Sequence, residues 1–220
     1  MLAQTKRSRR SGAATRDPER TRERLLRAAS QEMHSSGFRS ADLDIILAAA
    51  GVTKGALYYH FNNKEALGYA VVDEVIAGIT REKWVRPLQN SKSPIDALIR
   101  IIQSTSLKAE DLRRGCPLNN LSQEMSGLDE GFRRRTAKVF REWHDAIAAA
   151  LLAGQAHGVV RTDVDANDTA TFVIAVYEGY VSLAKNSQVA RTLRSGKTNV
   201  IRHLESLRPR RGRAQAAVSP

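Results

Sequence analysis

The chain has 220 residues, of which 42% are hydrophobic, 26% charged and 5% aromatic, and its formal net charge is +12 at pH 7. This content can build a sizeable core, but no apolar run reaches the roughly 18 residues of a membrane span, so we expect no membrane partner. A single cysteine, Cys116, excludes an internal disulfide framework and fits a reducing cytoplasm, while abundant Ala, Leu, Arg and Glu favour an all-α fold.

The positive charge is concentrated at the two ends of the chain. Residues 191–220 contain eight Lys or Arg and one acid, and residues 17–190 are neutral by count. Residues 1–16 contain no acid and five cations, which are Lys6, Arg7, Arg9, Arg10 and Arg16. Free basic segments commonly follow a phosphate backbone, although a tail can also serve only for solubility. We expect residues 1–17 to be a disordered basic arm and residues 209–220 a disordered basic tail.

Two helices and a tight turn are predicted after the arm. Pro18 suits the first turn of a helix that Asp17 caps, and apolar residues recur at helical spacing until Gly37 ends it. A second helix, over about residues 42–50, stops at Gly51, which permits the positive φ of a turn. A third short helix follows at once, so the spacing is that of a helix-turn-helix.

The third helix carries residues suited to contact with DNA. Thr53 is placed to cap it, and the hydroxyl can instead donate to a phosphate. The first turn is the part that reaches base edges in a major groove, and it contains Lys54, Gly55 and Ala56. Here glycine lets the backbone come close, and an alanine methyl can touch a thymine methyl. Polar tips on apolar rings, suited to phosphates along the groove wall, are offered by Tyr58, Tyr59 and His60.

Each of these residues also has an ordinary structural explanation. A lone tyrosine is commonly a half-buried packing residue, a lone histidine is commonly a surface or capping residue, and Thr-Lys-Gly alone is only a turn. Their order, directly after a helix that ends in Ala-Ala-Ala-Gly-Val, is what indicates DNA recognition. A helix this short is unstable alone, so Leu57 and Phe61 are predicted to hold it against the core.

The segment LAAAGVTKGALYYHFNNKEAL, residues 47–67, resembles the DNA-binding core of the TetR family of transcriptional regulators. The resemblance is strong over about residues 20–68. It implies a three-helix DNA-binding domain, a helical effector domain, a homodimer on a pseudo-palindromic double-stranded operator, and repression relieved by a small-molecule effector. By matching positions, it implies phosphate contact by Lys64 and DNA contact by Thr53, Lys54, Ala56, Tyr58, Tyr59 and His60.

Three positions at or near the start of the second helix depart from the family pattern. This helix usually opens with two hydroxyl residues, whereas this chain has Ala41 and Asp42 there. Either Ser40 or Asp42 can still cap the helix, but an acid repels phosphate. Ile45 stands where a polar residue is usual. We expect the basic arm to compensate by entering the neighbouring minor groove.

Further helices are predicted to the C-terminal side. Asn62 and Asn63 are expected to cap a long helix from about Lys64 to Val85, which Pro87 ends. Ser93 and Pro94 are expected to open the next helix as cap and first-turn proline. Two long helices follow, over about residues 129–156 and 168–185, and the resemblance implies that they pair with their symmetry mates as a dimer interface. Burial within a monomer is the alternative.

The segment RRGCPLNNLSQE, residues 113–124, contains Cys116 at the expected start of a helix from Leu118. A helix N-terminus and the cations Arg113 and Arg114 would lower the thiol pKa and favour a reactive thiolate. The pattern is similar to a cysteine-containing TetR subgroup that senses electrophiles, so Cys116 is a candidate effector-sensing residue. The alternative is a small buried packing residue.

Motifs of enzymes and metal sites are missing from the sequence. There is no G-x-G-x-x-G, no phosphate-binding G-x-x-x-x-G-K-[ST] and no H-E-x-x-H, and the five histidines show no ligand spacing. The enzyme alternative is a Cys116 nucleophile with His144 or His157 as its base. We expect no enzyme activity, cofactor or metal.

The sequence therefore predicts an all-α, cytoplasmic, homodimeric repressor. Residues 18–68 are expected to form the helix-turn-helix DNA-binding domain, and residues 69–208 the effector-binding and dimerisation domain. The long helix from Lys64 would join them and transmit ligand entry to the reading helix. The alternative is a sequence-indifferent, nucleoid-type DNA-binding protein driven by the basic tails.

Overall fold

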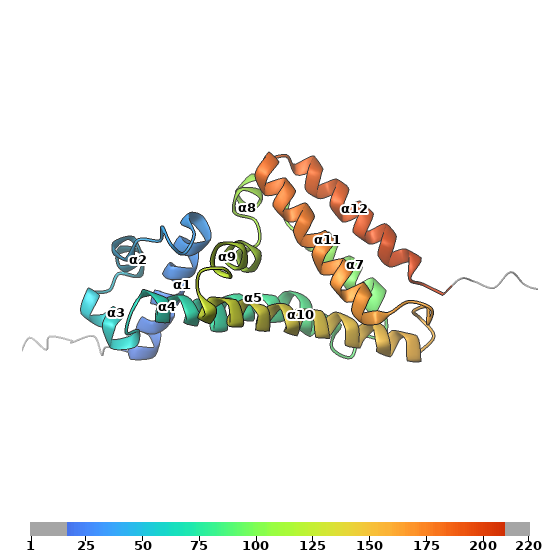
Figure 1. The fold of residues 1–220 in the computed structure, drawn as a ribbon, viewed down its shortest axis with the longest axis horizontal. Helices are drawn as coiled ribbons and strands as arrows, with labels where there is room; N and C mark the ends of the chain where they lie inside the picture. Colours follow the sequence, from blue (N-terminus) through green and yellow to red (C-terminus); the bar gives the residue numbers. More distant parts are fainter. Residues whose placement is uncertain (1–16, 210–220) are drawn as a thin grey trace, which may run out of the picture.

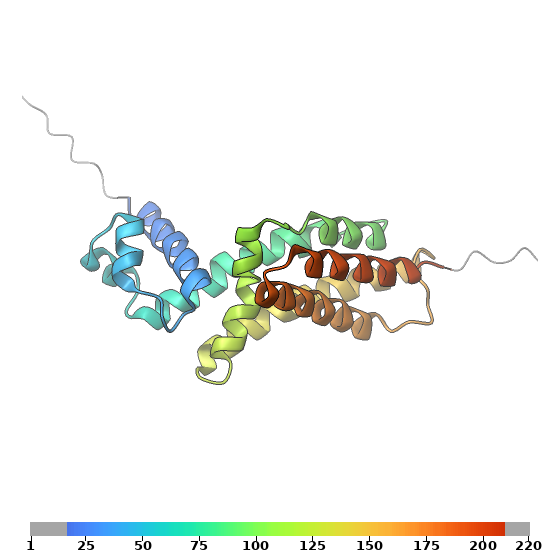
Figure 2. The same ribbon diagram turned by 90° about the horizontal axis from the view of Figure 1, so that it is seen from above.

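The computed structural model describes residues 17–209, and over this range every regular element is a helix (Figure 1). The all-α prediction is confirmed. A small head at one end is joined by a long helical run to a larger body (Figures 1 and 2). Residues 1–16 of the predicted arm and residues 210–220 of the predicted tail lie outside the described residues, whereas Asp17, the last residue of the predicted arm, is the N-cap of the first helix. Within residues 17–209, no helix is both long and apolar enough to cross a membrane.

The head contains the three predicted short helices, which are α1 (Pro18–Ser36), α2 (Leu43–Ala50) and α3 (Lys54–His60). Asp17 caps α1 by accepting the backbone N–H of Arg20 at 3.2 Å. Gly51 follows α2 in the left-handed region, with φ 59° and ψ 45°, so the turn needs the residue that the sequence places there. The apolar faces of the three helices meet in a shared core around Leu25, Ala29, Ile46 and Leu57.

The run that joins head and body begins at Lys64, as predicted, with Asn63 as its cap. It consists of α4 (Lys64–Ala70), η1 (Val71–Ile76), α5 (Ala77–Thr80), η2 (Arg81–Val85) and α6 (Arg86–Leu88). The segments η1 and η2 have π-helical hydrogen bonding, which the apolar spacing did not indicate. Pro87 lies inside α6, so the helix ends after Leu88 and not before the proline. The missing N–H of proline removes only one bond of the last turn, and the chain leaves the helix directly afterwards.

The body is built from α7 (Pro94–Ser104), α8 (Ala109–Arg114), α9 (Pro117–Met125), α10 (Glu130–Ala156), α11 (Ala166–Ser187) and α12 (Ala190–Ser206). In Figure 1, α10 runs beside the joining helix, while α7, α11 and α12 form an oblique second layer. The predicted helices α7, α9, α10 and α11 are present. Ser93 stands at the N-cap position of α7, but its side chain makes no capping hydrogen bond.

Two helices of the body were not predicted, α8 and α12. Residues 191–208 were assigned to the body without a predicted helix, and most of them form α12, which packs against α7 and α11. Its apolar contacts come from Leu193, Val200 and Leu204, all of which are buried. The cations of this range therefore belong to the folded body and not to the tail expected over residues 209–220. The helical spacing of these apolar residues was hard to recognise in the sequence because exposed cations, such as Arg194 and Arg202, lie between them.

Candidate nucleic-acid interface and effector cavity

All of the sequence-predicted DNA contacts except Lys64 lie together on α3 and at its N-cap. Thr53 caps α3, its Oγ1 accepting the backbone N–H of Ala56 at 3.3 Å. Lys54 and Gly55 are exposed, Tyr58 is 45% exposed and Tyr59 is 77% exposed. The partly exposed residues are Ala56 and His60, and the His60 ring lies edge-on to Tyr59 with centroids 5.0 Å apart. As predicted, Leu57 and Phe61 are buried and hold the helix against the core.

Gly55 has room for a side chain within the protein itself. A Cβ added there would meet only the Oγ1 of Thr53, at 3.9 Å, and its backbone φ is not in the left-handed region. Neither packing nor backbone conformation in the described chain therefore requires glycine at this position. An external surface that comes close to the first turn of α3 would require it.

Lys64 lies at the start of α4 but is not simply a solvent-directed cation. Its Nζ donates to the backbone carbonyl of Arg39 at 3.1 Å and lies 5.2 Å from the centroid of the Phe38 ring. The ammonium group of Lys64, predicted to contact a phosphate, is thus held against the loop between α1 and α2. This loop also carries the exposed side chain of Arg39, a candidate contact that sequence reasoning missed.

The N-terminus of α2 is occupied by carboxylates. Asp42 caps the helix, with its Oδ1 accepting the backbone N–H of Asp44 at 2.8 Å, which settles the choice between Ser40 and Asp42. The side chain of Ile45 on the same helix is 52% exposed. Two negative charges at this helix end disfavour a phosphate there, so the departure from the family pattern has a structural consequence.

A groove of about 620 Å³ lies between α1 and the first turn of α3. Thr21 and Arg24 line it from α1, and the Nη2 of Arg24 donates to the carbonyl of Gly51 at 3.0 Å. Pro18, the first residue of α1, also lines this groove, so the basic arm joins the described chain beside it. Thr21 and Arg24 are further candidates that the sequence did not single out.

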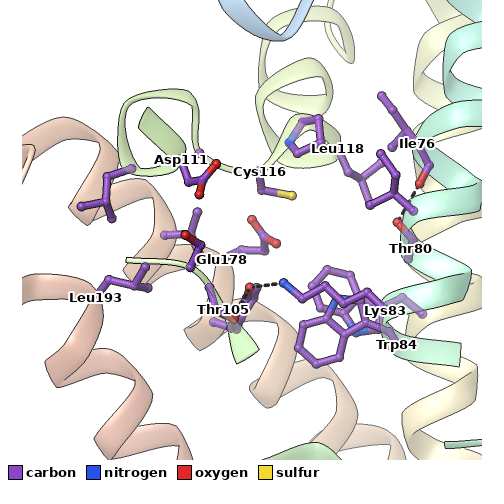
Figure 3. A pocket seen from close by; sticks show the side chains of 18 residues that line it. Ile76, Thr80, Lys83, Trp84, Thr105, Asp111, Cys116, Leu118, Glu178 and Leu193 are labelled. Atoms are coloured by element: carbon purple, nitrogen blue, oxygen red, sulfur yellow. Dashed lines mark hydrogen bonds between the residues drawn. The ribbon is translucent and has the colours of Figure 1, made fainter. Parts of the chain in front are cut away.

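A second cavity, of about 200 Å³, lies in the body among the joining helix and α8 to α12 (Figure 3). One wall is aromatic: the Trp84 ring centroid lies 4.4 Å from that of Trp143 and 5.0 Å from that of Tyr177. The other apolar residues around the cavity are Ile76, Ile79, Leu112, Leu118, Val181 and Leu193. The cavity thus has the apolar and aromatic lining of a small-molecule site, and its volume lies below the roughly 300 Å³ at which pockets for drug-sized ligands begin.

The polar side chains of this cavity come from the joining helix, α11 and the loop after α7. Lys83 donates from Nζ to the hydroxyl of Tyr177 at 2.8 Å, and this hydroxyl lies 3.0 Å from the Oγ1 of Thr105. Glu178 is only 6% exposed, and neither carboxyl oxygen accepts a hydrogen bond from a described residue. Burial raises the pKa of Glu178 to about 7, although the nearby Cys116 thiol and Lys83 ammonium oppose the rise.

Cys116 also lines the cavity, but the expectation of a lowered thiol pKa is wrong. Burial, and next the negative charge of Glu178, raise the pKa of Cys116 well above its ordinary value. The backbone N–H groups of Asn119 and Leu118 act in the opposite direction but do not overcome these two effects. Arg114, expected to assist the thiolate, instead pairs with Glu110 at 2.8 Å. Cys116 is therefore a thiol in the cavity wall.

Helix α9 connects this cavity with the head (Figure 1). Leu118, in its first turn, lines the cavity. Glu124, near its other end, accepts the backbone N–H groups of Phe38 and Arg39, each at 2.8 Å. Just before α9, the carbonyl of Gly115 lies 3.0 Å from the Nε2 of His34 on α1. A shift of α9 would therefore act directly on the loop between α1 and α2.

No group of three or more His, Cys, Asp or Glu side chains in residues 17–209 is arranged to hold a metal ion.

Both parts of the chain match family models. Residues 25–71 match the bacterial regulatory proteins of the tetR family, and residues 94–199 match the tetracyclin repressor-like C-terminal domain. The matches cover the two parts separately and do not distinguish the cysteine-containing subgroup.

Individual proteins give the same result. The chain is 30% identical to the transcriptional regulator AcuR of Cereibacter sphaeroides over 73% of this chain and 74% of AcuR. It is 27% identical to the transcriptional repressor DhaR of Mycobacterium sp. strain GP1 over 73% of this chain and 80% of DhaR. A solved TetR transcriptional regulator from Chloroflexus aurantiacus superposes with a TM-score of 0.77 at 29% identity, covering 88% of this chain and 98% of that one.

Proposed function

This chain belongs to the TetR family of transcriptional regulators, and we propose that it is a dimeric repressor that leaves its operator when a small molecule enters the body cavity. The observation that carries the proposal is the surface of α3. Two tyrosines and a lysine are exposed there, on a seven-residue helix clamped by the buried Leu57 and Phe61. Packing within a monomer does not require exposed tyrosines and a lysine on so short a helix, whereas binding in a DNA major groove does.

We assign different tasks to the residues of this surface. Lys54 and Ala56, at the start of α3, are proposed to read base edges, and Gly55 allows the close approach that this needs. Tyr58, Tyr59 and His60 are proposed to contact phosphates, together with Thr53 and Lys64 once DNA is present. Residues 17–68 contain seven Lys or Arg and seven Asp or Glu, so the head has no net charge to attract DNA. The basic arm, residues 1–16, is therefore proposed to supply much of the electrostatic attraction.

We propose that residues 18–68 bind DNA and that residues 69–208 bind the effector and dimerise. Helices α10 and α11 support the second assignment, since each exposes large apolar side chains: Leu152 is 52% and Leu183 57% exposed. Exposed leucines on neighbouring long helices are a surface that a second copy of the chain can cover.

The route from effector to DNA is proposed to pass through α9. A ligand that displaces Leu118 would shift α9 and with it Glu124, whose carboxylate holds the backbone of Phe38 and Arg39. That loop leads directly into α2 and α3. A small shift there changes the separation of the two reading helices in a dimer, which must match the roughly 34 Å repeat of DNA.

The experiment that tests the proposal compares affinities for an operator and a scrambled duplex of equal length. Tyr59→Ala should weaken both, because phosphate contacts carry no sequence information. Lys54→Ala should reduce the ratio of the two affinities by about tenfold or more, because a base contact contributes about 1–3 kcal/mol of discrimination. A ratio near one for the unmodified protein would instead identify a sequence-indifferent, nucleoid-type protein.

The similarity around Cys116 suggests a covalent alternative at the same cavity, in which an electrophile modifies the thiol. The raised pKa of Cys116 argues against it, since the thiolate is the reactive form. Release from DNA by a maleimide should therefore be slow. Rapid release of the unmodified protein, absent in Cys116→Ser, would establish the covalent alternative and contradict reversible release.

A further inference from the structure

The body cavity contains two buried polar groups that lack a hydrogen-bond partner among the described residues. One is the carboxyl group of Glu178, which is 6% exposed, and the other is the indole Nε1–H of Trp143, which is 1% exposed. Both residues line the cavity, and Glu178 faces the interior with Cys116 and Lys83 (Figure 3). Buried polar groups nearly always have a partner, so a ligand that supplies the missing partners gains binding free energy.

The shape and walls of the cavity limit what can enter. Its volume is about 200 Å³. A cavity of about 150 Å³ holds a benzene ring, so this one accepts a ring with only a few further atoms. Trp84, Trp143 and Tyr177 offer aromatic surfaces against which such a ring can pack.

The charges around the cavity disfavour an ionised ligand. Lys83 already lies over the rings of Trp84 and Tyr177, 5.4 and 5.2 Å from their centroids, where a ligand cation would otherwise bind. The ammonium group of Lys197 adds a second positive charge near Lys83. The pKa of Lys197 is lowered mainly by burial and, to a smaller extent, by the charge of Lys83. A ligand anion would in turn meet the carboxyl groups of Glu178 and Asp111, and that of Glu178 accepts no hydrogen bond from a described residue. A neutral ligand avoids both penalties.

This inference rests on the proposed function, which makes the cavity the effector site. We infer that the effector is a small neutral aromatic molecule with a hydroxyl group, whose hydroxyl hydrogen donates to Glu178 and whose ring packs on Trp84 and Trp143. A hydroxyl group has one donor and two acceptor lone pairs. The same group can therefore also accept the Nε1–H of Trp143.

The probes that test the inference are phenol, anisole, benzylammonium and benzoate, which share a ring and differ in the polar group. Binding to the full-length protein is followed by calorimetry and by tryptophan fluorescence, since both tryptophans of the chain line the cavity. Phenol should bind at least tenfold more tightly than anisole, which keeps the ring and the acceptor but lacks the donor. Tighter binding of benzylammonium, benzoate or anisole than of phenol would overturn the inference.

The variants Glu178→Leu and Glu65→Leu form a matched pair. Both remove a carboxylate, but Glu178 is buried in the cavity lining, whereas Glu65 is exposed on α4 and does not line the cavity. Glu178→Leu should weaken phenol binding at least tenfold and leave anisole binding unchanged, and Glu65→Leu should leave both unchanged. Equal loss for the two ligands, or no loss for phenol, would show that Glu178 does not accept the hydroxyl.

A separate measurement distinguishes failure of this inference from failure of the proposed function. Operator release is measured with phenol at saturating concentration. Binding of phenol without release would leave the ligand class standing and contradict the effector role of the cavity. Specific operator binding without any phenol binding would leave the repressor standing and overturn the ligand class.

Discussion

Glu178 carries a buried carboxyl group, and the nearby Cys116 thiol and Lys83 ammonium do not compensate for the effect of burial on its charged form. Because burial raises its pKa from 4.5 to about 7, the folded chain holds this proton more tightly than the unfolded chain does. The contribution of Glu178 to stability is therefore greatest below about pH 4.5 and is lost as the pH rises to about 7. Above that pH the ionised group destabilises the fold.

Replacing Glu178 by glutamine should remove this pH dependence, because an amide does not ionise. At about pH 8 we expect Glu178→Gln to be more stable than the parent, by an amount on the order of 3 kcal/mol at most, and near pH 4.5 the two should be alike. Urea unfolding at the two pH values measures the difference. Asp111→Asn, at an exposed position, serves as control. An advantage that does not shrink towards low pH would mean that Glu178 is stabilised by a partner.

Gly55 offers a way to separate folding from DNA binding. Because a Cβ there meets only Thr53, at 3.9 Å, Gly55→Ala should fold normally and gain up to about 1 kcal/mol in stability. Its affinity for operator DNA should nevertheless fall, since the methyl group would stand between the first turn of α3 and the groove. Thermal melting and a gel-shift titration give the two results. An unchanged affinity of Gly55→Ala for operator DNA would contradict a close approach of the Gly55 backbone to the DNA.

The residues of α3 were accessible to sequence reasoning because their arrangement is local. Cap, first turn and clamping residues lie within nine positions of one another, from Thr53 to Phe61. The pKa of Cys116 was not accessible in this way. It is set by burial under several helices and by Glu178, which lies far along the chain, so the nearby arginines and helix N-terminus gave the wrong direction.

Helix α9 is the element that links the two candidate sites. It touches the cavity through Leu118 and the head through Glu124, and its position is also set by packing against α10. Gly37 shows how closely the head fits onto it. A Cβ at this glycine would come within 2.9 Å of the Oε2 of Glu124, and the backbone φ of 81° also favours glycine.

Removing the carboxylate of Glu124 should weaken this link. We expect Glu124→Ala to cost about 1–3 kcal/mol of stability, since two backbone donors lose their charged acceptor. The more specific expectation is that effector binding remains while effector-driven release from DNA becomes smaller. Gln123→Ala, an exposed neighbour on the same helix, is the control. Full release by Glu124→Ala would place the coupling in another element.

Helices with clear apolar spacing and caps were predictable, and α12 was not. Its buried residues Leu193, Val200 and Leu204 are separated by cations and glycine, so the apolar spacing did not indicate a helix. These widely spaced apolar residues are buried because α12 packs against α7 and α11, and the sequence does not show that these helices lie there. The short α8 has a single buried residue, Leu112, which is too little to indicate a helix.

For the whole molecule, the exposed apolar side chains of α10 and α11 define a surface that we propose a second copy covers. Leu152→Glu and Leu183→Glu, made separately, should shift the protein from dimer to monomer. Each would bury an unpaired carboxylate in the interface, and the free energy lost by desolvating this charge exceeds the free energy gained from the remaining apolar contacts. Light scattering after size exclusion measures the mass. Ile45→Glu, at a similarly exposed position on the head, should stay dimeric. A dimer that survives both leucine variants would place the interface on another surface.

The most direct test of the whole account is selection of random duplex DNA by the full-length protein, followed by sequencing. A dimer that reads DNA with two copies of α3 predicts one enriched pseudo-palindrome, whose half-sites lie about one helical turn, roughly 34 Å, or a multiple of it apart. The same selection with Lys54→Ala should relax one symmetric pair of positions in that sequence. Enrichment of no common sequence, with binding that depends on salt alone, would contradict the account.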